Sequence, residues 1–579
     1  MRIDSATVLP TASKVSPLTL NSSVLSATDV ETEMSEDLLC QQDVLPVVVD
    51  VASELLGSAV SAHDNLFRLG GNSMLAARLV AEVRKRVDVS IGLQDVLKAE
   101  TFAALADRLV AKNCRALSVG DNCLSVEPNL SDIDNPGLTS FQRQRLRRDL
   151  LQLASTGRRT PYHIGSFYLL DGNLDQDLLE VAAQDLVQRH DALRMNFDLN
   201  AGAPRATTEY SDGQRVVTVI QRTFHDNAAA LQACRDASLE PFDLANSLKI
   251  RITIAPMGGA RSLMGIALEH LVCDLDSLNI LVGDLALAYT ARQRGSAPCW
   301  STPAPSFQQW AFEDQTRTSG EGFARRLNHW RGVLDPLMPI PEMRFPSMRE
   351  PIGISVRNAA QSTVNVMDTT AVALSERFKE SAVTLFAGLS ALLCVATSVA
   401  TGQSVSSFVA PLQQREAGWE QCVGHFSHIV PVRAYVDRYK SVADLSRDIM
   451  FGVAEAASYD VDAELLLSSL TGAPFDRSKW LPWLYFDIAN STSSTLLKLD
   501  SVAVSEVDEE FDMNLRDGVT LIAAANGSGF RLWMQYEREV WQRQDADRFL
   551  NFYLQLIEGS IEHWNDPIGS WSQKGWSGF

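Results

Sequence analysis

A histidine and an aspartate four residues apart, His270 and Asp274, are the residues best suited to chemistry in this sequence. An apolar run about one strand long precedes His270, and the apolar residues after Asp274 recur at helical spacing, which predicts a strand-to-helix turn that carries an imidazole. An imidazole has an ordinary pKa of about 6.5, so it can accept or donate a proton at neutral pH. A histidine beside a strand can equally be a core residue, and the spacing alone leaves both interpretations open.

A second candidate is Ser73, which follows the pair Gly70-Gly71 and precedes a stretch with helical spacing. A serine at a helix start is a good N-cap, which is the structural interpretation. In the functional interpretation, the glycines leave the hydroxyl exposed at the positive end of the helix, where an enzyme can attach a phosphate ester. The spacing does not decide between the two.

The elements that must position these residues fall into five segments. Residues 1–35 are rich in serine and threonine without a clear period, and we expect a loose leader there. Helical patterns across 36–112 predict a small all-α unit of four helices, and the Gly, Asn and Pro residues of 113–137 indicate a linker. Strand and helix patterns then alternate, which predicts an α/β fold of two lobes, 138–305 and 306–579.

Composition excludes several classes of function. Lys and Arg total 51 against 71 Asp and Glu, and this acidic balance argues against nucleic acid or an anionic membrane as the main partner. The cysteines lack metal-ligand spacing, as in reduced cytosolic proteins, so we expect no metal site. Polar residues such as Thr384 and Ser390 interrupt the apolar segment 382–400, which we expect to be a core helix. The N-terminus has no signal pattern, and we expect a soluble, cytoplasmic protein.

Residues 64–76 read DNLFRLGGNSMLA, which resembles the peptidyl carrier domain of nonribosomal peptide synthetases, with a consensus close to DNFFxLGGxSLLA. The resemblance implies that Ser73 carries covalent 4'-phosphopantetheine, whose thiol holds an aminoacyl or peptidyl group as a thioester. It also implies that a phosphopantetheinyl transferase primes Ser73. Residues 9–15 resemble a worn copy of the segment that ends adenylation domains, and we expect a separate adenylation domain to load the carrier.

Later stretches resemble the condensation domains of the same synthetases and occur in that family's order. They read LTSFQRQRL at 138–146, RHDALRMNF at 189–197, PFDL at 241–244, VGHF at 423–426, PVR at 431–433 and FDMNL at 511–515. The resemblance extends from residue 138 to about residue 575. It implies two chloramphenicol-acetyltransferase-like α/β lobes in a V-shaped pseudo-dimer.

The catalytic motif of that family, HHxxxDG, falls on residues 269–275, which read EHLVCDL. His270 takes the place of the histidine on which catalysis depends. Asp274 takes the place of a structural aspartate that pairs with an arginine, and Arg415 stands where that arginine is expected.

Two positions depart from this motif, Glu269 in place of the first histidine and Leu275 in place of the glycine. Neighbouring residues of a strand point to opposite faces, so Glu269 need not contact His270. If it did, its charge would raise the pKa of the imidazole and make a weaker base. Leu275 adds bulk where the family keeps a bare backbone.

The resemblance implies amide formation in nonribosomal peptide synthesis, a secondary-metabolic chemistry that includes antibiotic biosynthesis. An amine on a downstream acceptor carrier would attack the thioester on this chain's own carrier. His270 can remove the amine's proton or only position the amine, and the residues leave both roles open. The alternative is a degenerate, non-condensing domain that serves as a platform and recruits tailoring enzymes to the loaded carrier.

Overall fold

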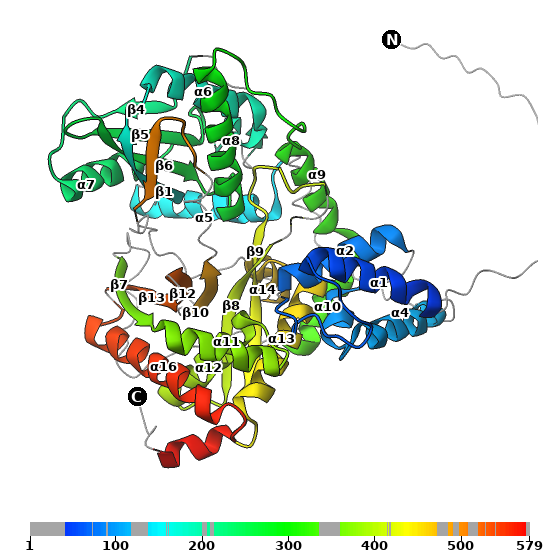
Figure 1. Cartoon of the computed structure of the whole chain (residues 1–579). Helices are drawn as coiled ribbons and strands as arrows, with labels where there is room; N and C mark the ends of the chain where they lie inside the picture. Colours follow the sequence, from blue (N-terminus) through cyan, green and yellow to red (C-terminus); the bar gives the residue numbers. More distant parts are fainter. Residues whose placement is uncertain are drawn as a thin grey trace, which may run out of the picture.

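The computed structural model contains two α/β lobes and a small helical unit beside the second of them (Figure 1). It describes residues 41–71, 73–87, 91–116, 137–157, 159, 161–199, 205–208, 213–334, 359–413, 415, 418–471, 484–489, 497–507, 519–526, 529–538 and 540–574.

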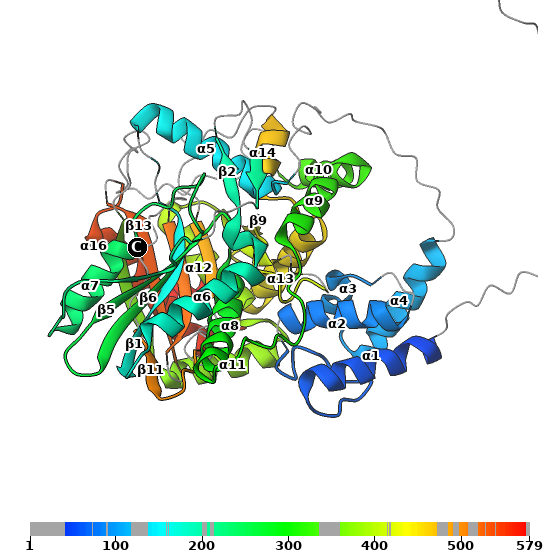
Figure 2. The same cartoon turned by 90° about the horizontal axis from the view of Figure 1, so that it is seen from above.

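The described part of the helical unit consists of α1 (Gln41–Leu56), α2 (Ser73–Arg86), α3 (Leu93–Leu97) and α4 (Phe102–Ala116). Each helix is apolar on one face, and the unit buries these faces together at Val48, Leu79 and Leu105. The predicted four-helix unit is therefore confirmed. α3 packs against α13 (Val442–Ser458) of the second lobe, and Figure 2 shows the unit beside that lobe from above.

The first lobe is built on a sheet whose described strands run in the order β11-β1-β6-β5-β4. These strands are β1 (His163–Gly172), β4 (Val217–Val219), β5 (Ile250–Pro256), β6 (Arg261–Glu269) and β11 (Val502–Glu506), while β2 (Asn196–Asp198) and β3 (Arg205–Thr207) form a separate ribbon. The helices of this lobe are α5 (Ser140–Thr156), α6 (Gln176–Arg189), α7 (Asn227–Ser238) and α8 (Leu275–Gln293), with a 3-10 turn, η2 (Asp191–Arg194).

The second lobe has its own sheet, with described strands in the order β7-β13-β12-β10-β8-β9. The strands are β7 (Ala359–Val366), β8 (Val405–Gln413), β9 (Ser427–Tyr435), β10 (Leu484–Ala489), β12 (Val519–Asn526) and β13 (Gly529–Glu537). The further helices are α9 (Phe307–Arg317), α10 (Gly320–Val333), α11 (Asp368–Glu380), α12 (Leu385–Thr401), α14 (Ala463–Thr471), α16 (Arg543–His563) and the 3-10 helix η4 (Ile568–Lys574). α12 is buried along most of its length, which confirms the predicted core helix.

The chain returns to the first lobe late in the sequence. β11 pairs antiparallel with β1 of the first sheet, and Gly172 lies opposite Val502. A Cβ on Gly172 would lie 2.5 Å from Ser501 O, so this close approach requires glycine. The segment 306–579 therefore also contributes a strand to the first lobe, and the division at residue 305 stays a prediction. A five-residue strand carries no local sign of the sheet that it joins.

Within the described part of the chain, no single helix is both long enough and apolar enough to cross a membrane. α11 and α12 reach that length and apolarity only as a pair, and the pair is bent by 104°.

Candidate active site

The turn between β6 and α8 carries the candidate histidine, at residues 270–274, so the predicted strand-to-helix turn is confirmed. Asp274 is the N-cap of α8, and its Oδ1 accepts a hydrogen bond from Ser277 N at 2.9 Å. The backbone N–H of His270 donates to Tyr162 O at 2.7 Å. The turn is thus fixed to α8 on one side and to the segment ahead of β1 on the other.

The ring of His270 is held in one tautomer. Nδ1 lies 2.6 Å from Cys273 O, and because a carbonyl oxygen only accepts, Nδ1 carries the proton. Nε2 keeps its lone pair and has no hydrogen-bond partner among the described residues. Burial lowers the pKa of His270 below its ordinary value, so the neutral ring predominates at neutral pH. The residue is partly exposed, and its Nε2 lone pair is suited to act as a base.

Aromatic rings from both lobes surround His270. The ring of Tyr162 lies 4.2 Å away between centroids, and the ring of His425, from the second lobe, lies 5.0 Å away. His425 stacks on Phe141 with centroids 3.6 Å apart and planes 6° apart. His425 was not among the predicted site residues, although a histidine inside the apolar motif at 423–426 was a visible signal.

Arg415 reaches Asp274 from the second lobe, and the expected contact is present. Arg415 Nη2 donates to Asp274 Oδ1 at 2.6 Å, and both side chains are almost completely buried. The same nitrogen donates to Ser277 Oγ at 2.9 Å, and the guanidinium carbon lies 4.4 Å from the ring centroid of Phe426. Removing one partner of a buried ion pair typically costs about 3–5 kcal/mol. The pair therefore fastens the histidine turn to the second lobe.

The same turn also holds the backbone on both sides of His425. Asp274 Oδ2 accepts a hydrogen bond from Phe426 N at 3.1 Å. Ser277 Oγ accepts from Gly424 N at 3.0 Å and donates to Gly424 O at 2.7 Å. The residues that cap α8 thus fix the position of an imidazole that comes from the other lobe.

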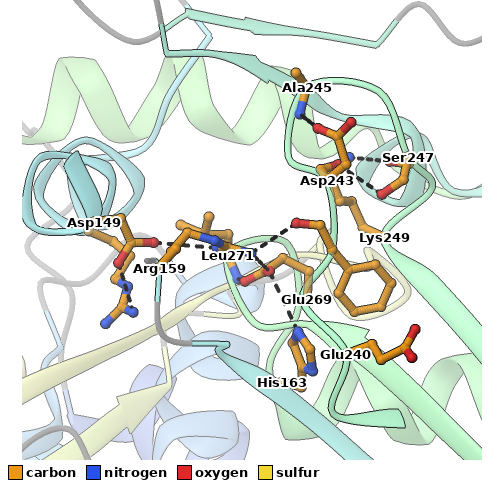
Figure 3. A network of polar contacts seen from close by, with 12 residues as sticks. Asp149, Arg159, His163, Glu240, Asp243, Ala245, Ser247, Lys249, Glu269 and Leu271 are labelled. Carbon is orange, nitrogen blue, oxygen red and sulfur yellow. Dashed lines mark hydrogen bonds and ion pairs between the residues drawn. The ribbon is translucent and has the colours of Figure 1, made fainter. Parts of the chain in front are cut away.

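Glu269 is fully buried inside the first lobe, at the position of the motif's first histidine. Its Oε2 accepts a hydrogen bond from Arg159 Nη2 at 2.9 Å and lies 4.0 Å from His163 Nε2. Arg159 is also paired with Asp149 at 3.4 Å. Figure 3 shows the carboxylate between the guanidinium of Arg159 and the imidazole of His163. Among the described residues, no contact joins the side chains of Glu269 and His270.

The charge of Glu269 is offset within this network. Burial raises the pKa of Glu269, and the charge of Arg159 opposes that rise. Burial alone would lower the pKa of Arg159, but the charges of Glu269 and Asp149 outweigh burial and raise this pKa. Burial and the charge of Arg159 lower the pKa of His163 to about 3, and its Nδ1 donates to Ser238 O at 3.1 Å. Glu269 therefore forms an ion pair with Arg159 beside a neutral imidazole.

Leu275, the second departure from the motif, is the first residue of α8 and is 43% exposed. Its backbone is helical and its φ is not positive, so a side chain at this position causes no backbone strain. The leucine adds apolar bulk at the surface of the turn and does not fill the core.

Ser73 is the first residue of α2 and follows a tight turn. Gly71 N donates to Leu66 O at 2.9 Å, and a Cβ on Gly71 would lie 2.7 Å from that oxygen. Gly70 has a φ of +90°, a conformation that favours glycine. A serine at the positive end of a helix, after this turn, fits the attachment of a phosphate ester. The placement of the Ser73 side chain lies outside the described part of the structure.

Several predicted segments fall on residues that the structure does not describe. They are the leader at 1–35 with its segment 9–15, most of the linker at 113–137, and the motif at 511–515.

Comparisons with known proteins cover both parts of the chain. Residues 46–109 match the family described as the phosphopantetheine attachment site, and residues 138–573 match the condensation domain. The carrier unit therefore holds 4'-phosphopantetheine covalently.

Two curated relatives illustrate the likeness in sequence. The dimodular nonribosomal peptide synthase of Bacillus subtilis is 25% identical over 96% of this chain. Phosphinothricin tripeptide synthetase PhsB of Streptomyces viridochromogenes is 24% identical over 88% of it. The chain spans 23% of the first relative and 43% of the second, so it covers less than half the length of either.

Solved structures have the same fold as the two lobes. The X-domain from teicoplanin biosynthesis matches 77% of this chain and 99% of its own, with a TM-score of 0.65 and 19% identity. The first condensation domain of the calcium-dependent antibiotic synthetase, in complex with a substrate analogue, matches 75% of this chain and 98% of its own, with a TM-score of 0.61 and 15% identity. The predicted pair of chloramphenicol-acetyltransferase-like lobes is confirmed. From the match over residues 138–573, we conclude that the chain belongs to the condensation domain family of nonribosomal peptide synthetases, with a carrier domain ahead of it.

Proposed function

We propose that this chain forms an amide bond between an acyl group held as a thioester on its own carrier and an amine held on a second carrier. The state of His270 supports this most directly. Its Nδ1 donates to Cys273 O at 2.6 Å, which leaves the Nε2 lone pair available. A neutral imidazole in this orientation can take the proton of an attacking amine.

Ser73 is the proposed attachment residue for 4'-phosphopantetheine. The thiol of the bound arm holds the acyl group as a thioester, which is already activated toward amines. Ser73 lies at the positive end of α2, where the helix dipole favours the phosphate of the linkage. Because the carrier and the lobes belong to one chain, presentation of the donor is intramolecular, which raises its effective concentration at the site.

His270 is the proposed catalytic residue. When an amine adds to a carbonyl, its nitrogen must lose a proton, and we assign Nε2 as the acceptor of that proton. The sulfur of the departing thiol then takes the proton from His270. We assign Asp274 and Arg415 as positioning residues, because their 2.6 Å ion pair holds the turn that carries His270.

Three partners complete this proposal. A separate adenylation domain activates the amino acid, a phosphopantetheinyl transferase primes Ser73, and a downstream carrier presents the amine. They are assigned because the chain belongs to the nonribosomal peptide synthetases and spans only 23% of one such relative, the dimodular nonribosomal peptide synthase of Bacillus subtilis.

The second candidate is the non-condensing platform, which the departures at Glu269 and Leu275 favour. One solved structure similar in fold is a complex of the X-domain and OxyB from teicoplanin biosynthesis, at 20% identity and a TM-score of 0.63. On this alternative, the loaded carrier and the lobes would bind a tailoring enzyme, and His270 would have no acid–base role.

The decisive experiment loads Ser73 with an aminoacyl pantetheine and supplies a small amine. Mass spectrometry then detects the amide and the freed thiol. We expect amide formation by the wild type and by H225A, a substitution of an exposed histidine, and its loss in H270A. S73A serves as the unloaded control. Intact, loaded protein that forms no amide with a range of amines would favour the platform.

A further inference from the structure

The proposed reaction leaves one buried imidazole of the site without a role. His425 is 6% exposed, and its Nδ1 is buried with no hydrogen-bond partner among the described residues. A buried polar atom without a partner destabilises a folded protein. The hydrogen-bonding capacity of this nitrogen therefore adds nothing to the stability of the described fold and stays unused within it.

The fold nevertheless fixes this ring beside the proposed base. Side chains of Asp274 and Ser277 hydrogen-bond the peptide groups that flank His425 at 2.7–3.1 Å. Its ring stacks on Phe141 at 3.6 Å between centroids and lies 5.0 Å from the ring of His270. His270 is partly exposed, whereas the buried His425 comes from the connection between β8 and β9, which packs against the core of the first lobe.

Amine addition requires two different groups. The amine nitrogen loses a proton to a base, and the carbonyl oxygen gains negative charge that a hydrogen-bond donor stabilises. His270 offers only a lone pair, because its N–H is used by Cys273 O at 2.6 Å. A neutral imidazole always keeps one N–H and can act as such a donor. Burial and the nearby His270 lower the pKa of His425 well below its ordinary value, so this ring stays neutral.

We propose that His425 donates a ring N–H to the carbonyl oxygen of the acyl thioester while His270 accepts the proton of the amine. This inference rests on the amide-forming function proposed above. The C–N bond forms as the carbonyl π pair moves onto oxygen, and the amine proton moves to His270 Nε2. The C–S bond then breaks, the carbonyl re-forms, and sulfur takes the proton from His270. His425 remains neutral throughout.

Infrared spectroscopy tests the hydrogen bond without any turnover. The full chain is loaded with an acyl thioester labelled with carbon-13 at the carbonyl, and no amine is added. H425F keeps an aromatic ring to stack on Phe141 but has no N–H, H425Q restores a side-chain N–H, and H225A is the exposed control. We expect a carbonyl band shifted to lower frequency in the wild type and H225A, absent in H425F and partly restored in H425Q.

Single-turnover kinetics test the same residue with a saturating amine. Loss of one donor to a developing oxyanion typically lowers the rate about 100-fold or more, so we expect this loss in H425F with the KM for the amine unchanged. Thermal unfolding checks that the variants fold, and H425L replaces H425F if that variant does not.

The two proposals fail in different ways. An H425F protein with an unshifted band and a rate within about two-fold of wild type overturns the role of His425 and leaves amide formation standing. A wild type that forms no amide overturns the proposed function. The band comparison then still decides whether His425 contacts the carbonyl.

Discussion

At the scale of single residues, the site separates one imidazole from the charges around it. His270 is neutral, with its N–H used by Cys273 O and its Nε2 lone pair free. The carboxylate of Asp274 is paired with Arg415 at 2.6 Å, and that of Glu269 with Arg159 at 2.9 Å. Neither carboxylate makes a hydrogen bond to the ring of His270 among the described residues. The ring can therefore remain an unprotonated base beside two acidic residues.

The pKa of His270 leads to a pH prediction. Burial lowers this pKa, so the neutral, active form is the major form at pH 6.5 and above. With an acceptor amine whose own pKa is low enough to keep it unprotonated, we expect the rate of amide formation to be more than half of its maximum at about pH 6.5 and to level off at higher pH. The rate should fall only at more acidic pH, as the lowered pKa is reached. Single-turnover rates measure this, and a fall in rate centred above about pH 6.5 would contradict it.

Removal of Glu269 should destabilise the first lobe. E269A removes the closer of the two carboxylates paired with Arg159, whose side chain is 12% exposed, and leaves only the 3.4 Å contact with Asp149, so we expect a loss of up to about 3–5 kcal/mol in the free energy of unfolding. E269Q keeps a hydrogen-bond acceptor and should lose less. D500A is the matched control, because Asp500 and Arg294 form an ion pair that is 57% and 72% exposed and is worth about 1 kcal/mol or less. Denaturant unfolding in which E269A is as stable as D500A would refute this.

At the level of helices and strands, the spacing of apolar residues predicted those elements that are determined by residues near one another in the sequence. The change from strand to helical period located the turn between β6 and α8, and the apolar run at 382–400 located α12. Contacts between distant segments had no such signal. Nothing near Glu269 in sequence indicates its ion pair with Arg159, and nothing near His425 indicates that it meets His270. Both pairings follow from how the elements pack.

The loop that ends at β9 should tolerate no side chain at Gly424. A Cβ there would lie 2.0 Å from Phe307 Cδ2, and G424A should lower the free energy of unfolding by about 1–3 kcal/mol or more. The rate of amide formation should also fall, because His425 is the next residue. G452A is the matched control inside α13, where a Cβ meets no atom within 4 Å and alanine should be neutral or stabilise by up to about 1 kcal/mol. If G424A and G452A have the same free energy of unfolding, the loop can accommodate a side chain at Gly424 and the prediction is wrong.

The contact between β9 and the loop after α13 should depend on pH. His428 Nδ1 lies 3.3 Å from Asp460 Oδ1. Burial lowers the pKa of His428, but the charges of the nearby aspartates outweigh burial and raise this pKa to about 9; they are Asp460, Asp462 and Asp314. Because the folded pKa exceeds the ordinary value of about 6.5, this contribution is complete below about pH 6.5 and is lost as pH rises through about 9.

H428Q removes the titrating group and tests this assignment. Between about pH 6.5 and 9.5 the wild type should lose on the order of 3 kcal/mol of stability more than the variant does. Unfolding curves across this range, measured in parallel, provide the comparison. The same pH dependence in both proteins would mean that another group titrates.

At the scale of the whole molecule, the site exists only where the two lobes meet. The first lobe supplies His270 and Asp274, and Arg415 and His425 come from the connection between β8 and β9, which reaches from the second sheet into the core of the first lobe. β11 also joins the two lobes, because this strand comes from the last third of the chain and pairs with β1 at the edge of the first sheet. The family resemblance was enough to predict two lobes and a carrier, because its motifs are local. The resemblance could not predict that β11 pairs with the first sheet, because that pairing depends on the exposed edge of β1 and not on residues near β11 in the sequence.

The catalytic role of His270 is tested by the ratio of single-turnover rates of amide formation between the wild type and H270A, both loaded on Ser73. A general base typically contributes a factor of about 100 to 10,000, so we expect a ratio in that range, with H225A equal to the wild type. A ratio of one, or no amide from loaded wild type, would contradict the assignment of His270 as the base of a condensing enzyme.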